Sequence, residues 1–133
     1  MPAQLSYDEL SELIIGAAIE VHRELGPGLL ESIYEHCLAL ELQKLSLPLL
    51  RQHIVNVKYK GTQLDLGFRI DLWVDERIIV EIKAVEAKLP VHTAQLLSYL
   101  KLTDCRLGLL INFNQETLIK GVKRVVNKFE EGS

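Results

Sequence analysis

The sequence lacks several features that would assign it to a specialised class of protein. Its two cysteines, Cys37 and Cys105, lie far apart and form no CxxC motif. We therefore expect free thiols in a reducing compartment, not a disulfide framework or a zinc site. No apolar run approaches the ~20 residues that span a bilayer, and residues 1–16 are polar and acidic, unlike a secretory signal. These absences predict a cytoplasmic protein without a membrane segment.

The chain also has no linker, internal repeat or low-complexity segment. Apolar residues make up 48% of its 133 residues and charged residues 25%, an ordinary balance for a globular protein. A chain of this length can bury one core of useful size. We expect residues 1–133 to form a single domain.

Charge is unevenly distributed along the chain. The formal net charge is −3, but residues 1–45 hold eight acids and two bases, whereas residues 46–133 hold thirteen bases and ten acids. The acidic total argues against general nucleic-acid binding. A basic run near the C-terminus is either a solvated face or a modest phosphate-contacting patch: Lys120, Lys123, Arg124 and Lys128.

The first 45 residues have the pattern of two helices, over 6–24 and 30–44. Ser6 followed by Glu9 fits a capping box, and apolar residues recur at helical spacing after it. The glycines and proline of residues 25–30 (LGPGLL) should separate the two helices.

From residue 49 the pattern changes to β-strands, with turns at Lys60-Gly61 and Asp75-Glu76. The further elements that we predict are strands 49–61, 62–76 and 77–84, helix 90–101, strand 106–113, and a segment 117–129 that is either a strand or a helix. This order (α-α-β-β-β-α-β) predicts an α/β fold with a mixed central β-sheet flanked by helices.

Strand 77–84 carries charges that need an explanation. Because side chains alternate along a strand, Glu81 and Lys83 should share one face, and Val80, Ile82 and Ala84 the other. Two charges on so apolar a strand are costly to bury unless they are used.

Asp71 on the preceding strand supplies a second acid. Alternation puts Arg69, Asp71 and Trp73 on one face and Ile70, Leu72 and Val74 on the other. A hairpin turn near residues 75–76 would bring Asp71 almost opposite Glu81. Two converging carboxylates repel each other unless a cation lies between them, and an all-oxygen site suits Mg²⁺ or Mn²⁺.

Two helices offer further polar side chains. Gln95 and Tyr99 lie four residues apart on helix 90–101, and Glu31, Tyr34 and Glu35 share one side of the second helix. Each feature taken alone has an ordinary explanation: a surface ion pair for Glu81 and Lys83, a solvated acid, a helix surface. The combination favours a functional site.

The ordered set resembles the PD-(D/E)XK nuclease superfamily, whose core is like that of restriction endonucleases. The order is a helix-borne Glu, a strand Asp, then Glu-x-Lys ten residues on, and Gln-x-x-x-Tyr on the next helix. The last element is similar to that of the RecB-like branch. Residues 28–34 (GLLESIY) match the spacing that names the GxxExxY family, and residues 81–103 and 108–113 also resemble that family's sequence.

The resemblance implies a metal-dependent nuclease that hydrolyses phosphodiester bonds through a metal-activated water. It implies that Asp71, Glu81 and the backbone carbonyl of Ile82 bind Mg²⁺ or Mn²⁺. Lys83 would position the attacking water and offset charge on the phosphate.

Three more residues gain roles from the same resemblance. Glu31 would be a catalytic residue that acts through a second metal ion or a bound water, while Gln95 and Tyr99 would contact the nucleic acid. The implied partner is nucleic acid, DNA rather than RNA. Cutting both strands would need a homodimer, because a chain this short has room for one site.

Two other functions remain open at this stage. One is a nuclease-like module that binds or assembles without cutting, and the joint presence of Asp71, Glu81 and Lys83 argues against it. The other is a hydrolase of small phosphorylated metabolites, which the acidic net charge and short loops would suit.

Overall fold

The structure, a computed structural model, describes residues 4–87 and 89–127. Its elements are α1 (Tyr7–Leu25), α2 (Glu31–Lys44), β1 (Leu49–Tyr59), β2 (Thr62–Val74), β3 (Ile78–Lys83), α3 (Pro90–Thr103), β4 (Leu107–Asn112), the 3₁₀ helix η1 (Leu118–Gly121) and β5 (Val122–Val126). None of the described helices is both long and apolar enough to cross a membrane.

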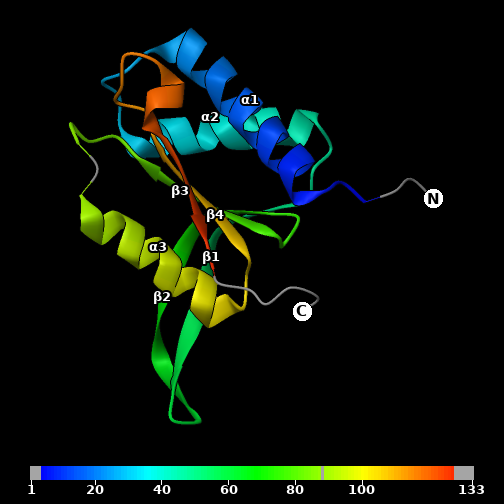
Figure 1. Cartoon of the computed structure of the whole chain (residues 1–133), viewed down its shortest axis with the longest axis vertical. Helices are drawn as coiled ribbons and strands as arrows, with labels where there is room; N and C mark the ends of the chain where they lie inside the picture. Colours follow the sequence, from blue (N-terminus) through cyan, green and yellow to red (C-terminus); the bar gives the residue numbers. More distant parts are fainter. Residues whose placement is uncertain (1–3, 88, 128–133) are drawn as a thin grey trace.

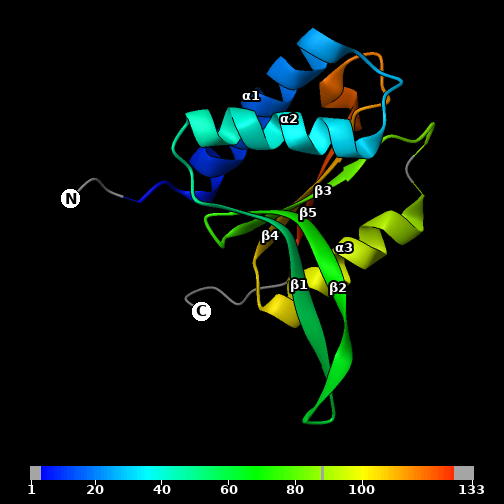
Figure 2. The ribbon, with the colours of Figure 1, turned by 180° about the vertical axis from the view of Figure 1, so that it is seen from behind.

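The five strands form one mixed sheet in the order β1-β2-β3-β4-β5. The pairs β1–β2, β2–β3 and β4–β5 are antiparallel, and β3–β4 is parallel, with α3 as the crossover between them. Helices α1 and α2 lie on one side of the sheet and α3 on the other (Figures 1 and 2). The predicted fold class is confirmed.

The core has two parts, one on each side of the sheet. The larger part joins α1 and α2 to residues of β2, β3 and β4, and the smaller part packs α3 against the opposite side. Every residue of β4 is buried, as its apolar residues 107–111 and its place inside the sheet require. Cys37 packs against the larger part and Cys105 lies in the smaller, so the sheet separates the two thiols.

Local sequence signals fix where the helices begin. Glu9 N–H donates to Ser6 Oγ (3.0 Å) and Ser6 N–H to Glu9 Oε1 (2.8 Å), the predicted capping box. Before α2, the Tyr34 hydroxyl donates to Gly26 O (2.6 Å) and accepts from Leu29 N–H (3.1 Å). The Tyr34 ring also stacks on Phe113, with centroids 4.5 Å apart. Tyr34 thus ties the loop before α2 to the core and fixes the position of the helix start.

The alternation predicted for β2 is wrong at one residue. Leu72 and Val74 pack toward α1 and α2, but Ile70 packs toward α3. The switch occurs at Asp71, opposite Gln52 of β1, whose φ of 48° lies in the left-handed region. A strand residue in that conformation breaks the pleat, so the sides exchange there. The alternation predicted for β3 holds, since Val80, Ile82 and Ala84 all join the larger part of the core.

The C-terminal segment, left open between strand and helix, forms η1 followed by β5, and its residues 128 and 129 lie outside the described residues. Two members of the basic run are paired with acids: Lys120 with Glu116 (3.8 Å) and Arg124 with Asp8 (3.2 Å). Lys128 also falls outside the described residues. These ion pairs favour the reading of the run as a solvated face.

Two glycines give opposite expectations for replacement by alanine. A Cβ on Gly67 would lie 2.2 Å from Val55 O, whereas one on Gly16 would meet nothing within 4 Å. Gly67→Ala should lower the free energy of unfolding by about 1–3 kcal/mol. Gly16→Ala, inside α1, should raise it by about 0.5–1 kcal/mol. Urea denaturation of both variants checks this, and equal shifts would contradict the close approach of β1 and β2.

Candidate active site

The two predicted carboxylates lie where β2 and β3 diverge. The pairing of the strands ends at Leu72 and Val80, and Asp71 and Glu81 occupy the next positions. There Ile82 N–H donates to Asp71 Oδ2 (2.9 Å), and Asp71 N–H lies 3.5 Å from Glu81 Oε1. The side-chain oxygens thus accept the hydrogen bonds that backbone carbonyls would accept if β2 and β3 continued to pair. This arrangement brings the two acidic side chains together.

Glu81 is only 7% exposed. Burial raises its pKa to about 9, and the negative charge of Asp71 acts in the same direction. Lys83 acts in the opposite direction, so its ammonium lies close enough to affect Glu81. Glu81 is therefore a buried carboxyl group that a nearby cation would stabilise as a carboxylate.

Helix α2 contributes two acids to the same region. Glu31, the first residue of α2, accepts a hydrogen bond from Ala84 N–H (3.1 Å), just beyond the end of β3. Glu35 is 7% exposed. Its carboxylate accepts from Arg51 (3.2 Å) and from the side chain of Gln52.

Gln52 connects Glu35 to the strand acids. The same Nε2 that donates to Glu35 lies 3.5 Å from Asp71 Oδ1. This contact depends on the left-handed conformation of Gln52, which breaks the regular pleat of β1. The amide thus bridges Glu35 of α2 and Asp71 of β2.

The two α3 residues predicted for the site behave differently. Tyr99 stacks on Phe68, with centroids 4.1 Å apart. Its pKa is raised by burial and then by the charges of Glu81 and Asp71, so its hydroxyl lies near both carboxylates. Gln95 is exposed, and its side chain has no hydrogen bond within the described parts of the chain. The structure brings Tyr99 to the acids and leaves Gln95 at the surface.

Asn112 holds the chain just after Lys83. It is fully buried, accepts from Val85 N–H (3.1 Å) and donates to Val85 O (2.8 Å). Lys83 O accepts from Phe113 N–H (2.9 Å). These bonds fix the end of β3, and with it the backbone from which Lys83 projects.

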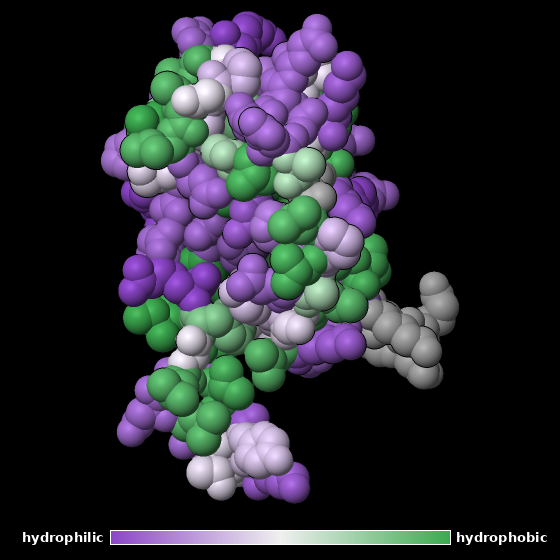
Figure 3. All heavy atoms as spheres, turned by 90° about the vertical axis from the view of Figure 1, so that its left-hand side faces the viewer, coloured by the Kyte–Doolittle hydropathy of each residue, from purple (hydrophilic) through white to green (hydrophobic). Residues whose placement is uncertain are grey.

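A cavity of about 560 Å³ opens beside these groups, within the size range of small-ligand sites. It is lined by Leu29, Leu30, Glu31, Ser32, Glu35, Gln52, Asp71, Ile82 and Ala84. One side of the molecule shows hydrophilic residues across its middle, between the helices and the β1–β2 hairpin (Figure 3).

Sequence reasoning did not assign three residues that the structure places here: Glu35, Gln52 and Asn112. Glu35 had a signal, because it lies one helical turn after Glu31. Gln52 and Asn112 had none. The first depends on a left-handed conformation in a strand, and the second is a polar residue at the end of an apolar strand.

The donor set fits a hard divalent cation. Asp71 and Glu81 offer carboxylate oxygens, the Ile82 carbonyl is the third predicted donor, and neither acid forms an ion pair within the described residues. No group of three or more His, Cys, Asp or Glu side chains in residues 4–87 and 89–127 is arranged to hold a metal. Such a small set suits Mg²⁺, which keeps several waters and takes few protein ligands.

A mixed sheet flanked by helices, with two acids at a strand divergence, is the architecture of a restriction-endonuclease-like domain. Residues 8–125 match the PD-(D/E)XK nuclease superfamily, and the chain belongs to that superfamily. No curated protein matches the chain. Among solved structures, it is similar to the one described as the crystal structure of SSO0001, with 15% identity, a TM-score of 0.47, and coverage of 92% of this chain and 80% of that chain.

Replacing Glu31 by alanine tests whether this acid serves the site or the fold. The variant loses one hydrogen bond to Ala84 N–H and a favourable charge at the start of α2, so it should lose only about 1 kcal/mol of stability. If the site hydrolyses phosphodiesters, that activity should fall at least tenfold while the variant remains folded. Activity assays beside thermal unfolding check this, and a grossly unfolded variant would show that Glu31 is structural.

Proposed function

We propose that this chain is a metal-dependent nuclease. Asp71, Glu81 and the Ile82 carbonyl hold Mg²⁺ or Mn²⁺, and Glu31 acts through a second metal ion or a bound water. When bound, the cation supplies charge neutralisation for the phosphate and acidifies water at neutral pH.

The chain's own residues orient the reaction. Lys83 lies on the side of β3 that carries Glu81, and its ammonium would hold the attacking water and offset charge on the phosphate. Tyr99, packed on Phe68, and Gln95, free at the surface of α3, would contact the nucleic-acid backbone.

The observation that carries this proposal is the meeting of two carboxylates with little to neutralise them. Asp71 and Glu81 fill the gap between β2 and β3, Glu81 is buried, and neither forms an ion pair in the described residues. Keeping such a pair costs stability. That cost is accounted for if the pair binds a cation.

The proposal also covers the family, the substrate, the oligomeric state, the domain and the location of the protein. Residues 28–34 carry the spacing of the GxxExxY family, and Gln95 with Tyr99 that of the RecB-like branch. We infer DNA as the substrate rather than RNA, a homodimer for cutting both strands, and a single domain over residues 1–133. We also infer a cytoplasmic location, because the thiols Cys37 and Cys105 lie on opposite sides of the sheet and suit a reducing compartment.

Metal titration followed by a hydrolysis assay tests the proposal. Calorimetry should show saturable Mn²⁺ binding to the wild type and none to Asp71→Asn. The matched control is Glu12→Gln, which removes one exposed acid on α1 and should bind as the wild type does. Labelled single- and double-stranded oligonucleotides with Mg²⁺ should then be cut by the wild type and the control alone.

Two results would contradict this function. Wild type that binds the metal but cuts no nucleic acid would favour a hydrolase of small phosphorylated metabolites. If the wild type binds neither the metal alone nor the metal together with an oligonucleotide, a module that binds or assembles without cutting becomes the better-supported function.

A further inference from the structure

The β1–β2 hairpin extends beyond the body of the protein. We name residues 53–69, its outer part, the arm. Figures 1 and 2 show it as a two-stranded ribbon that continues past the other strands and past α3. None of its residues is buried. A two-stranded ribbon with so little cover gains little stability from packing, so a function is a better reason for its length.

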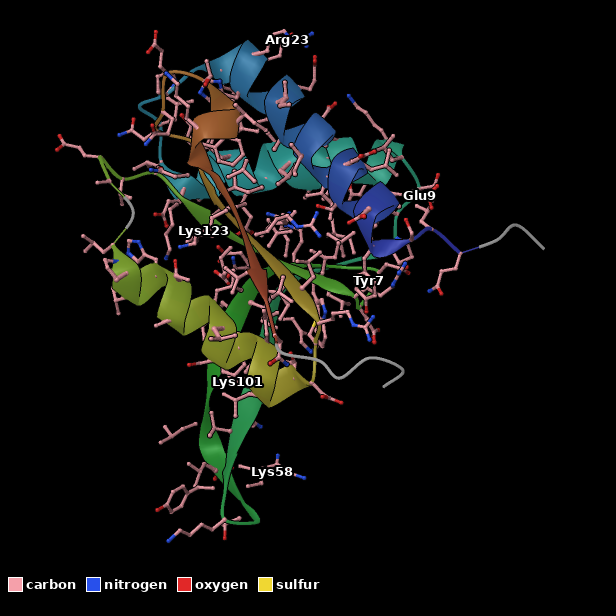
Figure 4. The ribbon with its side chains drawn as sticks, viewed as in Figure 1. Tyr7, Glu9, Arg23, Lys58, Lys101 and Lys123 are labelled. Carbon is pink, nitrogen blue, oxygen red and sulfur yellow. The ribbon has the colours of Figure 1, made fainter. Side chains whose placement is uncertain are left out.

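The arm is basic in an acidic protein. It carries Lys58, Lys60 and Arg69 against one acid, Asp65, whereas the whole chain has a net charge of −3. None of these three bases forms an ion pair within the described residues. Lys58 extends sideways from the ribbon, clear of the body of the molecule (Figure 4). The C-terminal basic run differs, because two of its members are paired.

The arm also exposes large apolar and aromatic side chains. Ile54 is 59% exposed, Tyr59 61% and Leu66 71%, and hydrophobic residues gather along the arm in Figure 3. At the tip, Lys60 Nζ lies 5.4 Å from the centre of the Tyr59 ring. An exposed ring with a lysine ammonium beside it and a second lysine one position before it in the strand is a combination that binds a single nucleic-acid strand, with phosphates on the cations and a base on the ring.

The base of the arm is part of the site. Gln52, just before it, contacts Glu35 and lies near Asp71, and Phe68 within it stacks on Tyr99. From Gln52 to Tyr59 a strand spans about 23 Å. Phosphates follow one another at about 3.4 Å along a stacked strand, so the tip reaches about seven nucleotides from the reacting phosphate.

We propose that the arm binds the single-stranded part of the substrate, with Lys58 and Lys60 on phosphates and Tyr59 stacked on a base. This inference rests on the proposed nuclease function and names the surface that grips the strand. The recognition is independent of sequence, since neither phosphates nor ring faces distinguish the bases.

Fluorescence anisotropy with labelled single-stranded DNA, with Ca²⁺ in place of Mg²⁺, tests this. For a strand of about 20 nucleotides, Lys58→Glu/Lys60→Glu should weaken binding at least tenfold and lower the logarithmic salt slope by about 1.4. Lys44→Glu/Lys120→Glu, which changes the net charge equally on α2 and η1, should have little effect. Tyr59→Leu should weaken binding about tenfold. A strand of about four nucleotides should bind all variants equally.

A small diester, bis(p-nitrophenyl) phosphate, separates the failure of this inference from the failure of the function. The arm variants should hydrolyse it as the wild type does. If the wild type hydrolyses the diester but both double variants bind the long strand equally, the arm proposal is wrong and the nuclease chemistry stands. If the arm variants lose a dimer seen by light scattering but keep strand affinity, the arm is a contact between copies and the proposal is again wrong.

Discussion

Lys83→Ala should remove most of the hydrolysis and leave metal binding intact. Lys83 ends β3 on the side that carries Glu81, and its charge lowers the pKa of Glu81 against the effect of burial. Losing one positive group from a site where negative charge develops reduces turnover by about 10²–10³-fold. The carboxylates and the Ile82 carbonyl remain, so Mn²⁺ should still bind with similar affinity in calorimetry.

Two further variants make the role of Lys83 specific. Lys101→Ala removes an exposed cation from α3 and should turn over as the wild type does. Lys83→Arg keeps the charge but replaces a compact ammonium with a planar group, so it should restore only a small part of the activity. Unchanged turnover in Lys83→Ala would show that Lys83 has no role in hydrolysis. Full activity in Lys83→Arg would show that only the positive charge of Lys83 matters, and not its compact ammonium group.

Glu81→Gln should stabilise the metal-free protein at neutral pH while abolishing metal binding. Burial and Asp71 raise the pKa of Glu81 from 4.5 to about 9, so the folded state holds a proton that the unfolded state releases. Between pH 4.5 and about pH 9, the free energy of unfolding of the wild type must therefore fall as the pH rises. The glutamine amide of the variant does not titrate, so its stability should not depend on pH in this way. At pH 8 the variant should be more stable than the wild type by roughly 1–3 kcal/mol, which is less than the full pKa shift would give because the site relaxes.

Urea denaturation from pH 5 to pH 9 measures this difference. The two proteins should differ little at pH 5 and progressively more toward pH 9, and Glu12→Gln should follow the wild type throughout. Saturating Mn²⁺ should reduce the pH dependence of the wild type, since a cation that binds only the folded state stabilises it. Equal pH slopes for wild type and Glu81→Gln without metal would show that Glu81 keeps an ordinary pKa.

Much of the fold could be predicted because its signals are local. The Ser6 capping box, the turns at 60–61 and 75–76, and the apolar run of residues 107–111 in β4 act over a few positions each. The last element was left open because a short 3₁₀ helix precedes β5, and the combined segment has neither a clear helical nor a clear strand period.

The site, like the fold, has some features that local sequence predicts and others that it does not. Alternation on β3 and a short hairpin bring Asp71 and Glu81 together, and both are local properties. Gln52 could not be found, because its place in the site requires a left-handed φ that alternation does not anticipate. The same residue explains why Ile70 packs on the side opposite to Leu72.

The sequence by itself determined the order of elements as far as β4, the pair of acids on adjacent strands and the superfamily pattern that they belong to. Only the tertiary structure decided which residues of α2, β1 and α3 lie beside those acids. Glu31 reaches Ala84 across 53 residues and Gln52 reaches Asp71 across 19. Such contacts depend on how each helix packs on the sheet, and side-chain periodicity specifies which side of an element is apolar but not where along its partner it docks.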